Sequence, residues 1–182
     1  MPGNKAVNEN RETAIAHVSE RLERLISGAL TTLELLDDWR YQIETSSAQL
    51  ENRHAVREYI DFFRAMIGGA SVECQRIREE LAHSVELAHV NILRQIAGDA
   101  SDQRSRCVLF RDKWINKPLP YESVRPLLND ISVTTRDQLT AFDELDQLAS
   151  SLETLTRVEP PAAAEQKRSF DRRALFMRLF RG

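Results

Sequence analysis

The chain of 182 residues is long enough for one domain, and 42% hydrophobic residues can close a core without disulfides or metals. Charged residues make up 29% of the chain, and the mean hydropathy of −0.43 is ordinary for helices that each expose a solvated face. No apolar stretch approaches the ~20 residues that a membrane-spanning helix needs, and no alternating runs bounded by turn residues predict strands. We therefore expect a soluble, all-α protein without a sheet.

Apolar residues at spacings of three and four predict a first helix that begins near Asn8 to Asn10. A turn is expected at residues 45–47, followed by a second helix that ends at Gly68 and Gly69. The stripe of the first helix consists of Ile15, Val18, Leu22, Leu25, Ala29, Leu33, Leu36, Trp39 and Ile43.

Three further helices are predicted by the same rhythm. Ser71 is expected to cap the third helix, which continues through Cys74, Ile77, Leu81, Val85, Ala88, Ile92 and Ile96. Residues 98–102 are expected to form a surface turn, and a short fourth helix covers residues 101–116. Ser123 is expected to cap a fifth helix with Pro126 in its first turn, and this helix continues to about Thr156.

These elements predict an up-and-down antiparallel bundle of about five helices, in which helices one, three and five are long. Thr135 and Gln138 form a polar layer in the apolar stripe of the fifth helix, and such layers can fix register or oligomeric state. The near-heptad stripes are equally compatible with a coiled-coil homodimer that pairs long helices, so the monomeric bundle and the dimer remain alternatives.

The domain division predicted from composition has four parts. Residues 1–8 form a disordered N-terminus, 9–157 the bundle, 158–166 a Pro/Ala linker and 167–182 a basic tail. The tail holds six basic residues and one acid, a local charge of +5, which leaves −8 for residues 1–166 out of the net −3. An acidic body with a basic tail is the first hint of function.

The tail combines arginines with bulky apolar residues and is expected to form an imperfect amphipathic helix. Such a segment can lie on an anionic membrane surface, dock in a groove of a protein partner, or fold back on its own acidic bundle. Nucleic acid is not expected, because one short cluster on an acidic body gives a weak phosphate footprint. The candidate docking or membrane residues are Phe170, Arg172, Arg173, Leu175, Phe176, Met177, Arg178, Leu179 and Phe180.

Three histidines follow a glutamate by three residues, in the pairs Glu51/His54, Glu80/His83 and Glu86/His89. This spacing presents two metal ligands in di-iron helical bundles. On one continuous helix, however, the second and third pairs would point about 120° apart, at 100° per residue. We therefore predict surface charge there, and no metal site.

Arg78 and His83 match the Arg-x4-His spacing of HEPN-type helical ribonucleases, where the pair acts on the scissile phosphodiester. Glu79 and Glu80 lie directly between them and would repel RNA. The prediction is therefore against a nuclease.

His17 begins a run, continuing through Leu22, Leu25, Ile26 and Leu33, that resembles the first helix of histidine-kinase dimerisation and phosphotransfer domains. The resemblance covers about 20 residues and implies His17 as the phosphoacceptor. Val18 stands where that family has an acid, and Leu22 where it usually has a proline.

Cys74 and Cys107 lack CxxC partners, and we expect both to be reduced and half-buried. The polar N-terminus lacks a signal sequence, which predicts a cytoplasmic location, with the inner face of a membrane as a second site. The leading hypothesis is a non-enzymatic helical adaptor or scaffold without cofactors, which engages a protein partner and is tethered by its tail. The alternatives are a histidine phosphotransfer module that uses His17 and a helical ligand sensor.

Overall fold

The computed structural model describes residues 3–45, 53–116 and 124–157, and every element within them is helical. The all-α prediction is confirmed for these residues. The elements are α1 (Gly3–Thr45), α2 (Arg53–Glu80), α3 (Leu87–Phe110), the short π-helix η1 (Arg111–Ile115), α4 (Arg125–Ala141) and α5 (Glu144–Arg157).

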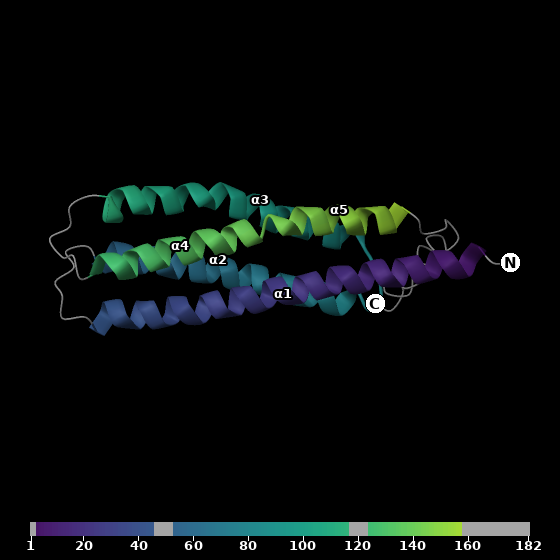
Figure 1. Ribbon diagram of the computed structural model, residues 1–182, viewed down its shortest axis with the longest axis horizontal. Helices are drawn as coiled ribbons and strands as arrows, with labels where there is room; N and C mark the ends of the chain where they lie inside the picture. Colours follow the sequence, from purple (N-terminus) through teal and green to yellow (C-terminus); the bar gives the residue numbers. More distant parts are fainter. Residues whose placement is uncertain (1–2, 46–52, 117–123, 158–182) are drawn as a thin grey trace, which may run out of the picture.

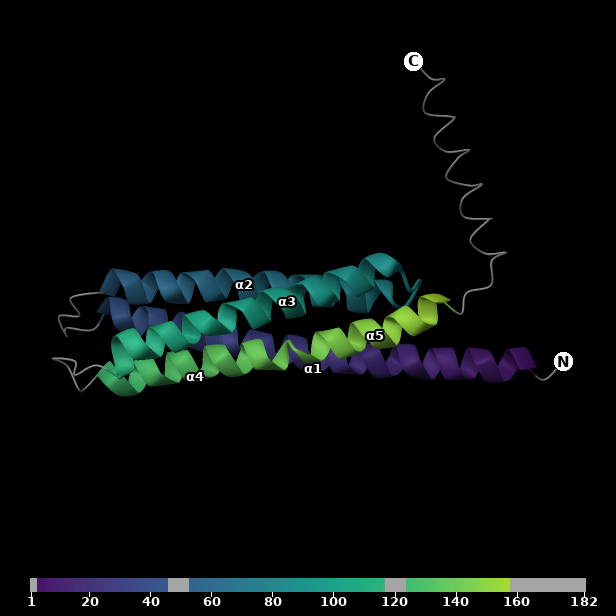
Figure 2. The same cartoon turned by 90° about the horizontal axis from the view of Figure 1, so that it is seen from above.

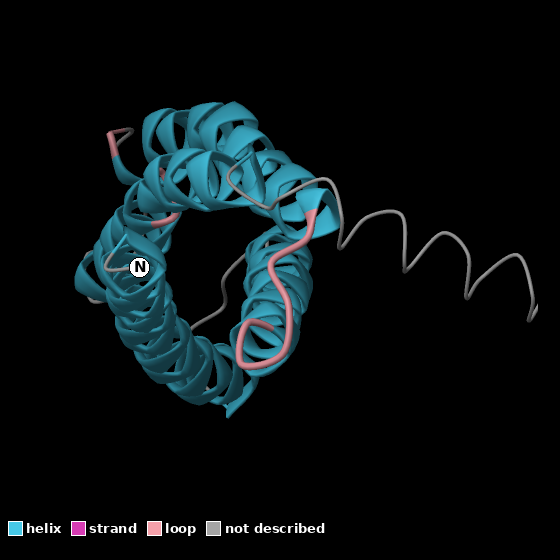
Figure 3. Cartoon of the chain, turned by 90° about the vertical axis from the view of Figure 1, so that its right-hand side faces the viewer, coloured by secondary structure: helices cyan, strands magenta, loops and turns pink. Residues whose placement is uncertain are grey.

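The helices run along one long axis and form an elongated up-and-down bundle (Figure 1). We call each segment that runs along the bundle a rod. The rods are α1, α2, α3 continued by η1, and α4 followed end to end by α5 (Figure 2). Viewed along the long axis, the rods surround a common core (Figure 3). α1 packs closely on α2, and α3 packs on α4 and α5, whereas α2 and α3 approach each other least closely of the neighbouring rods.

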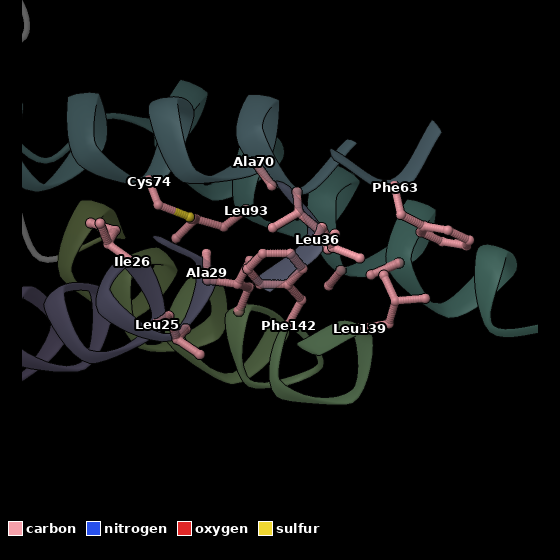
Figure 4. Packing of buried hydrophobic residues seen from close by; sticks show 14 of the residues in the cluster. Leu25, Ile26, Ala29, Leu36, Phe63, Ala70, Cys74, Leu93, Leu139 and Phe142 are labelled. Carbon is pink, nitrogen blue, oxygen red and sulfur yellow. The ribbon is translucent and has the colours of Figure 1, made fainter. Parts of the chain in front are cut away.

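One apolar cluster runs through the whole bundle and receives side chains from every rod. Phe142, at the junction between α4 and α5, lies in the middle of this cluster, beside Ala29 of α1 and below Ala70 of α2 (Figure 4). Full burial of each such large side chain stabilises the fold by about 1.5–3 kcal/mol. The largest side chains with essentially no exposure are Leu22, Leu36, Ile43, Ile60, Phe63, Ile67, Ile77, Leu93, Leu128, Ile131, Leu139 and Phe142.

α2 differs from its prediction because Gly68 and Gly69 do not end it. The apolar stripe continues in register from Ile67 through Ala70 to Ile77, so core packing outweighs the ~1 kcal/mol that each glycine costs in a helix interior. Ser71, predicted as a cap, lies buried inside α2.

The predicted third helix is broken by a tight turn at residues 81–86. Leu81 and Val85 remain buried, which explains why their spacing fitted a continuous helix. A capping box between Glu86 and His89 starts α3. The turn contains neither glycine nor proline, so the usual breaker signals were absent.

Three more boundaries differ from the predictions. Residues 98–102 are helical within α3, so the predicted fourth helix is the end of α3 with η1. The predicted fifth helix is interrupted at Phe142 and Asp143, and Pro126 lies in the first turn of α4 as expected. α1 begins at Gly3, ahead of its predicted start.

The predicted polar layer is buried. Thr135 and Gln138 of α4 are 0% and 6% exposed, and Thr32 of α1 donates a hydrogen bond to Gln138 Oε1 at 3.2 Å. Among the described helices, none is long and apolar enough to cross a bilayer. The predicted turn at 45–47 lies partly, and the linker and tail lie wholly, outside the described residues.

Candidate functional site

We call the interface between α2 and α3 the α2–α3 seam. At one end of this seam, a buried histidine joins the two helices. His89, near the start of α3, is 2% exposed, and its Nε2 lies 2.8 Å from Glu80 Oε2 at the end of α2. The turn at residues 81–86 brings these two side chains together. The prediction that the pairs Glu80/His83 and Glu86/His89 point apart assumed one continuous helix. That assumption was wrong, because the chain turns between the two pairs.

The tautomer of His89 follows from its two hydrogen bonds. The backbone N–H of Glu86 donates to His89 Nδ1 at 3.3 Å, so Nδ1 carries no proton. Nε2 therefore carries the proton and donates to the Glu80 carboxylate. The His89 ring thus joins the end of α2 to the start of α3.

Glu80 also receives hydrogen bonds from Arg76, which in turn bonds Glu73 one turn earlier on α2. His89, followed by Arg76, holds the pKa of Glu80 below its ordinary value. A polar hollow of about 410 Å³ opens beside this network. It is lined by Arg76, Glu80, His83, Ser84, Glu86, Ala88, His89 and Ile92.

The opposite end of the seam is closed by aromatic contacts. The rings of Tyr59 on α2 and Phe110 on α3 stack with centroids 4.0 Å apart. The Arg106 guanidinium lies 4.1 Å from the centroid of the Phe62 ring. Stacking and cation–π contacts of this kind stabilise by about 0.5–1.5 kcal/mol each.

Between these two ends the seam opens into an apolar hollow of about 240 Å³. Its α2 wall has small residues, Ala65 and Gly69, and a Cβ added at Gly69 would meet no atom within 4 Å. The floor is Phe142, and the rim carries Glu73 and the exposed Asp99. Met66, Ala70, Ile96 and Ala100 complete the lining. We call this hollow together with the adjoining polar hollow the α2–α3 groove.

Both cysteines are buried and unpaired, on α2 and α3. Burial raises the pKa of the Cys74 thiol to about 12 and also raises that of Cys107. A thiol protonated at neutral pH is a poor nucleophile. The two residues serve the core, and they are more deeply buried than the sequence suggested.

The remaining sequence candidates are scattered over the bundle. His17 is exposed on α1, and His54 is exposed and pairs with Glu58. Arg78 forms an ion pair with Glu23 of α1, whereas His83 is exposed in the turn. The tail candidates Phe170 to Phe180 lie outside the described residues.

No group of three or more His, Cys, Asp or Glu side chains within residues 3–45, 53–116 and 124–157 could hold a metal ion. The groove was missed because Gly68 and Gly69 were interpreted as a helix end. The small residues Ala65, Gly69 and Ala100 were its signal, but only the pairing of α2 with α3 places them opposite each other.

The comparisons with known proteins found no family model, no curated protein and no solved structure that matches this chain.

Proposed function

We propose that this protein is a non-enzymatic helical adaptor. Its bundle binds an amphipathic helix of a protein partner in the α2–α3 groove, and residues 167–182 tether the bundle to an anionic membrane surface or to a protein groove. The observation that supports the proposal is the apolar hollow of about 240 Å³ between Ala65, Gly69 and Ala100.

Helix-in-groove recognition needs an apolar trough that accepts anchor side chains at successive turns. The hollow is smaller than the ~300–1,000 Å³ typical of small-molecule sites and is open along the seam. It is large enough for an aromatic side chain of a peptide. Glu73 and Asp99 on its rim favour a partner helix with basic flanks.

The tail supports the tethering half of the proposal. Its six basic residues among bulky apolar ones suit an anionic surface, where each Lys or Arg contributes about 1 kcal/mol. Burial of Phe170, Phe176 and Phe180 in the interface would add to this attraction.

Tethering is tested by co-sedimentation with anionic and with neutral liposomes at low and high salt. The full chain is compared with a chain that ends at Val158. We expect salt-sensitive pelleting of the full chain alone, on anionic lipid alone. If neither chain pellets, the tail does not bind membranes, and it should then be used to capture a protein partner.

Partner binding is tested with a matched pair of variants. Gly69→Leu fills the hollow, whereas Gly98→Leu makes the same change on α3 outside the groove; added Cβ atoms at both sites meet no atom within 4 Å. Proteins that co-purify with the wild type should be lost with Gly69→Leu and kept with Gly98→Leu. Equal recovery with both variants would contradict docking in the groove.

A phosphotransfer module is the second candidate, supported by the exposure of His17 on α1. Incubation with a small phosphodonor would then label the chain, and His17→Gln would abolish the label. Removal of residues 167–182 would spare it. Absence of acid-labile label on the wild type would exclude this candidate.

A further inference from the structure

The α2–α3 groove combines an apolar hollow with a polar one, and its lining has an excess of acidic residues. Phe142 forms the floor of the apolar hollow, and Ile96 and Met66 belong to its lining. Glu73, Glu80, Glu86 and Asp99 line its two hollows, against one basic residue, Arg76. Its ligand should therefore combine apolar anchors with positive charge.

The chain contains one segment of that chemistry. Residues 167–182 combine a charge of +5 with aromatic and aliphatic side chains, and the preceding chain carries −8. An acidic groove and a basic apolar segment in one molecule attract each other at an effective concentration in the millimolar range, set by the linker.

The linker is long enough. α5 ends at Arg157, at the same end of the bundle as the turn at residues 81–86 (Figure 2). Phe142, the floor of the apolar hollow, lies 15 residues before Arg157, which is about 22 Å of helix rise. Residues 158–166 can span about 30 Å when extended.

We propose that residues 167–182 bind in the α2–α3 groove of their own chain, with phenylalanine side chains in the apolar hollow and arginines against Glu73 and Asp99. This inference deepens the proposed function and rests on it, because it names what covers the groove while the tether is unbound. Release of the tail then exposes the groove and frees the tether at once.

The test uses the full chain with one added thiol in the groove. Ala65 is exposed on the groove wall, and Ala141 is exposed at the end of α4, outside the groove. Ala65→Cys and Ala141→Cys are each labelled with a benzophenone maleimide, which spares the buried Cys74 and Cys107. Irradiation followed by mass spectrometry then identifies the cross-linked peptide.

We expect cross-links from position 65 to residues 167–182 in the monomer band, and at least tenfold fewer from position 141. Asp99→Lys should reduce them severalfold, and Asp102→Lys, one turn away and outside the lining, should not. Cross-links found only in a dimer band would show that a second copy supplies the tail and would overturn the proposal, as would their absence.

A second measurement separates this proposal from the proposed function. Gly69→Leu should raise the pelleting of the full chain on anionic liposomes relative to Gly98→Leu, because the tail is no longer held. Intramolecular cross-links without any liposome or partner binding would sustain the tail contact and refute the adaptor role. Liposome binding that Gly69→Leu does not change, without cross-links, would support the adaptor role and refute the tail contact.

Discussion

The two faces of α2 form interfaces of different kinds. Towards α1, ion pairs cross the seam at well-separated levels, Arg64 with Asp37 and Arg78 with Glu23, and Leu33 of α1 lies over Gly68. Towards α3, contacts concentrate at the two ends, around His89 and around Tyr59, and the middle is open.

This difference shows which surface the chain has completed by itself. The α1–α2 interface is closely packed, and paired charges cross it. In the α2–α3 seam, the apolar side chain of Phe142 lies at the bottom of an open hollow with acidic groups on its rim. Another segment can therefore bind there. The following experiments break or sharpen that contrast, from the largest expected effect to the smallest.

Truncation of a large side chain in the core that both interfaces share should have the largest effect on stability. Phe63 of α2 is 0% exposed and packs against the rings of Tyr59 and Phe62. Phe63→Ala should lower the free energy of unfolding by about 3–5 kcal/mol, measured by urea denaturation. Val72→Ala on the outer face of α2 is the control, and a similar loss in both would contradict the assigned core.

The hairpin end of the α2–α3 seam should depend on His89. His89→Ala removes the hydrogen bond to Glu80 and the cap on the Glu86 N–H, which should cost about 1–3 kcal/mol. His83→Ala, in the exposed turn, should change stability by less than about 0.5 kcal/mol. Equal effects in chemical denaturation would mean that His89 does not hold this end.

Substitution of the adjacent glycines Gly68 and Gly69 compares the packing of the two interfaces directly. Gly68→Ala places a methyl group about 4.0 Å from Leu33 in the closed seam, whereas Gly69→Ala points into the open one. Both should raise the free energy of unfolding, by about 0.5–1 kcal/mol, because a helical glycine is replaced. Gly68→Ala should gain more, and thermal unfolding of both variants would show it. A destabilised Gly69→Ala would mean that the open seam is already filled at that point.

Cross-seam ion pairs of α1 and α2 should contribute modestly, because their side chains are partly exposed. Arg64→Ala, which removes the pair with Asp37, should lower stability by about 0.2–1 kcal/mol. The loss should shrink at high salt. A loss that is independent of salt would indicate that Arg64 acts through its packing instead.

Acid sensitivity should arise partly at Glu80. Its pKa is lowered in the folded state by His89 and Arg76, so the folded chain binds fewer protons than the unfolded one as Glu80 titrates. Its contribution is present above the ordinary pKa of about 4.3 and is lost as the pH falls through the folded value. Glu80→Gln should flatten the dependence of stability on pH in this acid range. An unchanged slope in urea titrations between about pH 3 and 6 would contradict this.

Much of the fold followed from periodicity. The stripe from Val18 to Ile43 predicted α1, and its members Val18, Leu22, Leu36 and Ile43 are buried as expected. The polar layer at Thr135 and Gln138 was also visible in the sequence, because polar residues interrupt an apolar stripe. The all-α prediction needed only composition and the absence of alternating runs.

The boundaries inside that pattern were decided by tertiary packing. Gly68 and Gly69 lie within a helix, because burial of Ile67 and Ala70 outweighs their low propensity. The turn at 81–86 follows Glu80 without a breaker residue, and the Glu80–His89 contact that secures it exists only after the chain has reversed. The groove, too, arises from three segments that lie about 30–40 residues apart in the sequence.

The sequence by itself determined the class of fold, the faces that become core and the opposite charges of body and tail, because these depend on side-chain chemistry and its period along one helix. Only the tertiary structure decided where helices break and where Ala65, Gly69 and Ala100 meet above Phe142. Those features depend on which helix lies beside which, and no local pattern encodes that choice.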